Sequence, residues 1–179
     1  DCDLGNGTHG IFITGSGATG NGINGNVIIF SNNDGIAIQN GAQGNVITAN
    51  RMEHNGGLGI DLGSSGLNPN DNDYTAPPAI AGNANQNSPV LTLAYGGGSV
   101  GFASGSLSAR NGTYRINFYA DDSCPLPIVN DTGQGEYPLS QTIVTVTGGG
   151  TVNGTATFTD VPISRAGDRD FFTTPRLIL

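Results

Sequence analysis

The sequence contains no lysine, no tryptophan, only two cysteines and only six arginines. Without lysine the chain cannot form a Schiff base, use a lysine general base or close a Lys–Asn isopeptide crosslink. A net charge of −8 disfavours nucleic acid and anionic membrane surfaces as partners, because both attract clustered positive charge. No apolar run approaches the roughly 20 residues of a membrane-spanning helix, so membrane insertion is not expected.

The sequence leaves open whether the chain is complete and how its two cysteines are paired. The chain begins at Asp1 and shows no targeting segment, so we interpret it as a mature protein or a fragment. Cys2 and Cys124 could form a disulfide within the chain, remain as free thiols, or link neighbouring molecules. An intramolecular bridge would close a long loop and stabilise the fold by roughly 4–5 kcal/mol.

Turn-forming and β-branched residues dominate what is present. Glycine supplies 30 residues and asparagine 20, and the 15 isoleucines outnumber the 11 leucines. Glycine and asparagine favour tight turns, whereas β-branched apolar side chains favour strands. The composition therefore predicts an all-β fold with many short strands.

The first sixty residues repeat. One motif recurs at spacings of 25 and 24 residues, and a second motif lies between its copies. The first motif is GIFI (10–13), GIAI (35–38) and GIDL (59–62), and the second is GNVII (25–29) and GNVIT (44–48). A period in the twenties with short strands is typical of a solenoid, in which each repeat buries its apolar face against the next.

The alternation of side chains along a strand predicts which residues face inward. In the first motif we expect the isoleucines to point inward and Phe12, Ala37 and Asp61 to form an outward column. In the second motif we expect Ile28 and Ile47 to face inward, with Asn26 and Asn45 at equivalent places in successive repeats. Stacked asparagines can hydrogen-bond from one repeat to the next.

From about Ser88 the pattern changes to alternating apolar and polar residues separated by glycine-rich turns. The predicted strands are 89–95, 98–109, 112–120, 139–147 and 152–159, with a further strand in 170–179. Pro175 confines that last strand to an edge or a bend. Five or six antiparallel strands of this kind predict a β-sandwich.

Four motifs in this order resemble a family of secreted prokaryotic surface proteins. They are GNVIT.N…HNGG.GIDLG, GLNPND.D, N…N.PVL and GTYRINFYA…C, and they cover roughly residues 25–160. The resemblance implies a right-handed parallel β-helix of about three coils (residues 1–66), a linker or cap (67–88) and an immunoglobulin-like β-sandwich (89–179). It also implies extracellular or cell-surface display, often within a longer chain, and in most cases no assigned catalytic activity.

Two functions of different classes follow. The first is a structural or adhesive module, including a subunit of a filament that assembles with copies of itself or with further domains, because solenoid ends and open sheet edges pair with other chains. The alternative is a carbohydrate-binding or carbohydrate-active protein. Catalysis on a β-helix needs several acids and a cation on one face, whereas here only Asp61 and Arg51 are available. Stacking on sugar rings would depend on Tyr74, Tyr95 and Tyr137.

His9 and Asp34 each lie just before the glycine of a repeat. We therefore expect them to lie over one another on adjacent repeats. No serine or cysteine nucleophile stands beside them in the sequence, so we interpret the pair as a surface hydrogen bond rather than as part of a catalytic site.

An Asn/Asp patch follows the last repeat. Its oxygen-bearing residues suit Ca²⁺, and the candidate ligands are Asp61, Asn70, Asp71 and Asp73. Neither an EF-hand nor the glycine-rich nonapeptide repeat is present. We slightly favour the alternative interpretation of the patch, as a linker rich in Asx turns that ends at Pro77 and Pro78. No other cofactor is expected.

Four Asn-x-Ser/Thr sequons lie near predicted turns, at Asn6, Asn111, Asn130 and Asn153. In a secreted archaeal or eukaryotic protein they would be glycosylation sites. In a bacterial protein they would usually be chance products of a chain rich in Asn, Gly and Thr.

Overall fold

The computed structural model describes residues 5–63, 66–74, 81–97, 100–121, 134–148, 150–164 and 176–178. The fold is all-β, as the composition predicted, and within these ranges the one helical element is the 3₁₀ turn η1 (Asn83–Asn85). No helix in the described part of the chain is long and apolar enough to cross a membrane. Cys2, Cys124 and Asn130, and with them the disulfide, lie outside the described residues.

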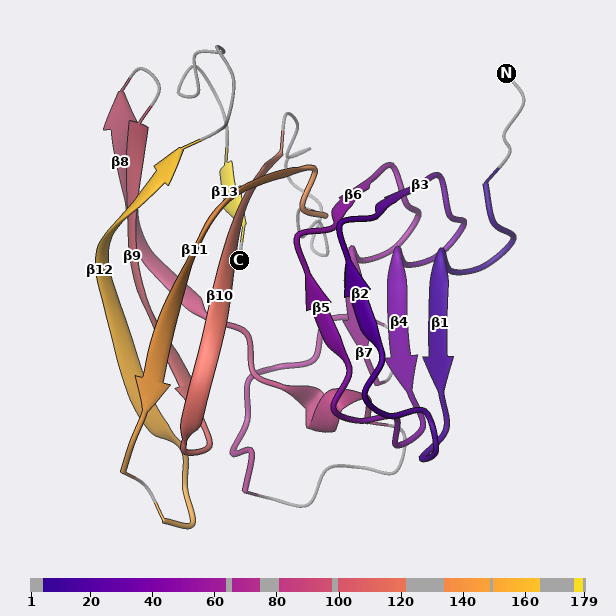
Figure 1. Ribbon diagram of the computed structural model, residues 1–179, viewed down its shortest axis with the longest axis horizontal. Helices are drawn as coiled ribbons and strands as arrows, with labels where there is room; N and C mark the ends of the chain where they lie inside the picture. Colours follow the sequence, from indigo (N-terminus) through magenta and orange to yellow (C-terminus); the bar gives the residue numbers. More distant parts are fainter. Residues whose placement is uncertain are drawn as a thin grey trace.

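The first part of the chain, called the parallel half below, consists of three parallel sheets (Figure 1). The sheets are β1 (Ile11–Thr14) with β4 (Ile36–Gln39) and β7 (Ile60–Leu62), β2 (Gly22–Asn24) with β5 (Val46–Thr48), and β3 (Val27–Ile29) with β6 (Arg51–Glu53). Each of the first two repeats contributes one strand to every sheet, and the third contributes only β7. Stacking in register pairs Ile11 with Ile36 and Ile36 with Ile60.

The predicted match between 25–29 and 44–48 is wrong. β2 pairs with β5 and β3 pairs with β6, so Ile23 lies beside Ile47 and Ile28 beside Met52. A five-residue unit, Gly/Ala–Asn–x–Ile/Met–x, occurs twice in each repeat, at 20–24 and 25–29 and again at 44–48 and 49–53. The sequence of residues 25–29 is more similar to that of 44–48 than to that of 49–53, which are the residues it pairs with. This similarity shifted the predicted strand pairing by one five-residue unit. Strands β2 and β6 were not predicted.

The core of the parallel half contains most of the residues predicted to point inward. Its buried and partly buried members are Ile11, Ile13, Ala18, Ile23, Ile28, Ile36, Ile38, Ala42, Ile47, Met52 and Leu62. Ile60 is 38 % exposed, because no further repeat covers the last strand. In the outward column Phe12 is exposed as expected, but Ala37 and Asp61 are fully buried, so that column is not a solvent-exposed face.

The second part, called the antiparallel half below, consists of two three-stranded antiparallel sheets. One has the order β12 (Gly154–Ser164), β9 (Val100–Ala109), β8 (Val90–Gly97), and the other β11 (Tyr137–Val146), β10 (Gly112–Asp121), β13 (Arg176–Ile178). The two sheets enclose one apolar core, in which Phe118 and Phe158 meet edge-to-face with ring centroids 5.7 Å apart. Strand β13 is an edge strand, as predicted for this segment.

Candidate functional site

Amide side chains bond one repeat to the next at the corners of the parallel half. At the first corner the backbone N–H and Nδ2 of Asn21 donate to Oδ1 of Asn45, at 3.0 and 2.8 Å. At the second corner Asn26 donates in the same way to Oδ1 of the fully buried Asn50, both at 3.0 Å. Asn50 Nδ2 donates in turn to the carbonyl of Ile23. Because buried polar groups are costly without partners, these bonds fix the repeats in register.

A residue with a left-handed backbone precedes each of these amides. Such a conformation turns the chain at a corner, and it is easiest for glycine. The positions lie 24 residues apart, as Gly20 and Gly44, Gly25 and Ala49, and Phe30 and His54. This pairing of a left-handed residue with a following Asn or Ser is the sequence signal that could have revealed three strands per repeat.

The third corner continues into the antiparallel half. The backbone N–H of Ser31 donates to Oδ1 of Asn55 at 3.0 Å, and the backbone N–H and Nδ2 of Asn55 donate to Oε1 of Gln134 at 2.9 and 3.0 Å. Gln134 Nε2 donates back to the carbonyls of Asn55 and Gly57 at 2.6 and 3.0 Å. A side chain at Gly59 would collide with the Gln134 carbonyl. Gln134 therefore takes the place that a further repeat would occupy.

The first corner is continued by the linker. Asn45 donates its backbone N–H to Oδ1 of Asn83 at 3.1 Å, and Nδ2 of Asn83 donates to the Asn45 carbonyl at 2.7 Å. The backbone N–H of Asn83 also donates to the Ala42 carbonyl. The end of the parallel half is thus closed at two of its three corners by amides from outside the repeats.

Asp121, at the end of β10, holds Gln134 in position. Its carboxylate accepts the backbone N–H groups of Gln134, Gly135 and Glu136 at 2.8, 3.2 and 2.6 Å. Burial raises the pKa of Asp121, whereas these three hydrogen bonds lower it by stabilising the carboxylate. The loop fixed in this way also places the Gly135 carbonyl 3.1 Å from the backbone nitrogen of Met52, so β6 has a partner beyond its own sheet.

Arg51 joins the same contact from the parallel half. Its guanidinium lies 2.7 Å from Glu53 and 3.8 Å from Glu136, and 5.3 Å above the ring of Tyr137. Burial, followed by the hydrogen bond with Glu136, raises the pKa of Glu53. The cation that could have served a catalytic face is therefore part of the joint between the halves.

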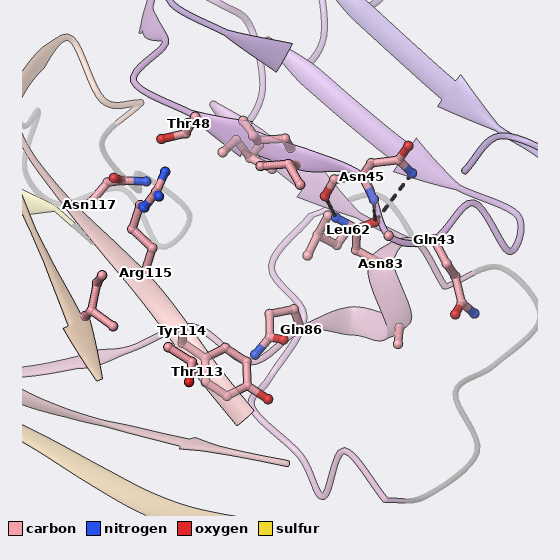
Figure 2. Close-up of a pocket in the computed structure, with 16 residues that line it drawn as sticks. Gln43, Asn45, Thr48, Leu62, Asn83, Gln86, Thr113, Tyr114, Arg115 and Asn117 are labelled. Carbon is pink, nitrogen blue, oxygen red and sulfur yellow. Dashed lines mark hydrogen bonds between the residues drawn. The ribbon is translucent and has the colours of Figure 1, made fainter. Parts of the chain in front are cut away.

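An open cleft of about 700 Å³ lies beside this joint, between β5 and β7 of the parallel half and β10 and β11 of the antiparallel half. Figure 2 shows Arg115 and Asn117 of β10 facing Thr48 of β5, with Tyr114 near Gln86. Arg115 forms no ion pair with any described residue. The cleft also exposes apolar side chains of Val46, Ile60 and Ile143.

The structure separates the four candidate calcium ligands. Asp61 and Asn70 line one small cavity of about 120 Å³, whereas Asp71 and Asp73 are not among its lining residues. The backbone of Asp71 is held by Asn87, which accepts its N–H at 2.9 Å and donates to its carbonyl at 2.8 Å. No three His, Cys, Asp or Glu side chains are grouped as a metal site within the described ranges.

The end of the patch is bound to the antiparallel half. The backbone N–H of Asp73 donates to Asn153 Oδ1 at 3.0 Å, and the Asp73 carbonyl accepts a hydrogen bond from Arg110. Burial is the main cause of the raised pKa of the Asp73 carboxyl. The Asn153 amide also donates to the Asp71 carbonyl, so the side chain of this sequon residue has a structural role. The sequon residues Asn6 and Asn111 are exposed.

The tyrosines considered for sugar stacking contact side chains of their own chain. The Arg110 guanidinium lies 5.4 Å above the Tyr74 ring, and Tyr95 stacks on Phe102 at 5.5 Å. His9 and Asp34 do lie together as predicted, with Nδ1 3.1 Å from Oδ2. Asp34 also accepts the backbone N–H of Leu58 at 2.7 Å, which ties the pair into the stack.

Comparisons with protein-family models, with curated proteins and with solved structures found no match. The resemblance noted in the sequence therefore stays a prediction.

Proposed function

We propose that the chain is a rigid, non-catalytic structural or adhesive module of an extracellular or cell-surface protein. In this proposal the parallel half is a short right-handed parallel β-helix, and the antiparallel half is an immunoglobulin-like β-sandwich. The observation that carries the proposal is the continuation of the amide ladder into Asn83 and Gln134. The resemblance to secreted surface proteins supports the same reading of the fold.

Rigidity follows from the kind of contact at the joint. Two domains in one chain usually move relative to each other, because their interface is small and polar. Here the interface combines part-buried hydrogen bonds between backbone groups and side-chain amides with the contacts of Arg51 to Glu136 and Tyr137, and each hydrogen bond contributes about 0.5–1.5 kcal/mol. Rotation of one half against the other would break the bonds of Asn55, Gln134 and Met52 together. A module of this kind transmits force and holds its two ends at a fixed distance.

Association is expected at the first repeat. Each of β1, β2 and β3 is at the edge of its sheet and has one partner strand among the described residues. Unpaired edges accept a further strand. At the opposite end Gln134 and Asn83 occupy two of the three corners, so we propose that copies of the chain, or further repeats of a longer chain, add at the first repeat.

Location and assembly are tested separately. Immunogold electron microscopy of source cells is expected to place the protein outside the cell, and label confined to the cell interior would contradict the proposal. Sedimentation velocity at rising concentration is expected to show association of the wild type. Val27→Glu, at an exposed position of β3, should abolish it, whereas Val152→Glu, exposed in the antiparallel half, should not. A strictly monomeric wild type would contradict self-assembly.

The cleft favours oligosaccharide binding as a second candidate function. Its amide, hydroxyl and guanidinium groups, with Tyr114 at one side, suit hydroxyl groups and a sugar carboxylate. A glycan array is expected to show acidic oligosaccharides retained by the wild type and lost from Arg115→Ala. Asn24→Ala, exposed on β2, is the matched control. An array without hits would remove this candidate.

A further inference from the structure

A small cavity lies between β7 and the linker, where it is lined by residues of both. We call it the linker cavity, and its volume is about 120 Å³. Its lining residues include Asp61, Asn68, Asn70 and Asn85. None of these side chains is basic, and the polar ones are rich in oxygen.

Asp61 is the charged group of the linker cavity. The residue is 0 % exposed, and neither carboxylate oxygen has a hydrogen-bond partner in the described structure. Burial raises the pKa of Asp61. The nearby backbone N–H groups of Gly66 and Leu62 act to lower it, but neither has the geometry of a hydrogen bond to the carboxylate. An isolated buried carboxylate is costly unless it is neutralised by a proton or a cation.

A second buried oxygen without a partner lines the same cavity. Asn85 Oδ1 accepts no hydrogen bond from any described residue. It lies against the Cα of Gly63, where a side-chain Cβ would come within 2.7 Å of it, so the glycine lets this amide approach the end of β7. Asn68 and Asn70 also line the cavity, and Asn70 Oδ1 already accepts the N–H of Ser88.

We propose that the linker cavity binds a calcium ion through the carboxylate of Asp61 and Oδ1 of Asn85, with backbone carbonyls and water completing the ligand shell. An all-oxygen donor set without imidazole or thiolate favours a hard cation. Ca²⁺ accepts irregular geometry, whereas Mg²⁺ requires a near-ideal octahedron and gives up its water reluctantly. Asp71 and Asp73 do not line this cavity and are not ligands, although the buried carboxylate oxygens of Asp73 also lack a hydrogen-bond partner among the described residues.

A single carboxylate sets a low affinity. Calcium sites with few charged ligands bind with Kd of about 10⁻⁴–10⁻³ M, the range of extracellular modules. The ion would attach the linker to β7 close to Asn83, which closes the first corner of the repeats. Calcium binding thus goes beyond the proposed structural function and would make the stiffness of the joint depend on the calcium outside the cell.

The test uses the full chain after treatment with a chelator, at constant ionic strength. Calorimetry is expected to show one saturable site with a Kd of about 0.1–1 mM, and thermal unfolding should shift upward with calcium but not with equal magnesium. Asp61→Asn should abolish both effects, whereas Asp71→Asn should keep them. Asn85→Asp adds a second carboxylate and should lower the Kd about tenfold, which tests the site even if Asp61→Asn fails to fold.

The proposal is overturned if 10 mM calcium (a concentration about tenfold above the expected Kd) changes neither heat nor unfolding temperature. It is also overturned if Asp61→Asn responds like the wild type, or if Asn85→Asp leaves the affinity unchanged. An Asp61→Asn variant that is more stable than the wild type, in a protein indifferent to calcium, would show that Asp61 is a buried protonated acid. None of these measurements depends on where the protein is located or on whether it assembles.

Discussion

Gln134 accepts the backbone N–H of Asn55 at 2.9 Å, as Asn55 accepts that of Ser31 at 3.0 Å. The two bonds are similar in length, but the first joins residues 79 positions apart and the second residues 24 positions apart. A glutamine from a loop of the antiparallel half therefore acts as the next step of a ladder built by the repeats. The parallel half is closed by the part of the chain that follows it.

Removal of this step should weaken the whole molecule. Gln134→Ala leaves the buried backbone and side-chain donors of Asn55 without their acceptor, so we expect a loss of about 2–3 kcal/mol in the free energy of unfolding. Urea unfolding measures the change. Gln141→Ala, at an exposed position of β11, is the control and should change stability by less than about 0.5 kcal/mol. Equal effects of the two variants would show that Gln134 does not hold the joint.

The ladder within the repeats should be equally sensitive. Asn50 is fully buried, accepts two bonds from Asn26 and donates one to Ile23. Asn50→Ala should therefore cost about 2–4 kcal/mol, because it leaves several buried polar groups unpaired. Chemical denaturation of this variant and of the exposed control Asn24→Ala tests the prediction, and a loss below 1 kcal/mol, about the value of one ordinary hydrogen bond, would contradict it.

One corner carries a backbone conformation that its residue disfavours. Ala49 has a φ of 52° at a position equivalent to Gly25, whose φ is 68°. Ala49→Gly removes the Cβ clash and should stabilise the protein by up to about 1 kcal/mol, the left-handed penalty less the greater freedom of glycine in the unfolded chain. Ala42→Gly, in the core and without a positive φ, should be destabilising in the same thermal unfolding assay. A destabilising Ala49→Gly would contradict the geometry of this corner.

Stability in the absence of calcium should depend on pH through Asp61. Burial, with the neighbouring charge of Asp34, raises the pKa of Asp61 from 3.8 to about 6. The folded state therefore holds this proton more tightly than the unfolded state, and its contribution is complete below about pH 4 and lost as the pH rises to about 6. The loss is on the order of 2–3 kcal/mol. Unfolding curves between pH 4 and 7 should show it in the chelated wild type, and a profile identical to that of Asp61→Asn would contradict it.

The sequence predicted the repeat, the all-β class and the strands from Val90 onward, because these depend on local periodicity. It did not predict the pairing of β2 with β5, since Asn26 resembles Asn45 in its sequence neighbours but lies over Asn50. The burial of Asp61 was missed because it depends on the linker, which carries no strand pattern. The part played by Gln134 was not predictable, because a single residue outside the repeat gives no periodic signal.

The joint can be followed from both sides with natural probes. Met52 is the only methionine and lies in the core of the parallel half, whereas the five tyrosines all lie at or beyond Tyr74. A labelled Met52 methyl group thus reports on one half by NMR, and tyrosine fluorescence reports on the linker and the other half. Coincident transitions from independent probes indicate a single cooperative unit.

The most direct test of the account is the urea unfolding of the wild type followed by both probes in one sample series. If Gln134 and Asn83 join the halves into one rigid module, the two curves coincide, and Gln134→Ala separates them. If the wild-type curves already have different midpoints, the halves unfold independently and the central claim is wrong.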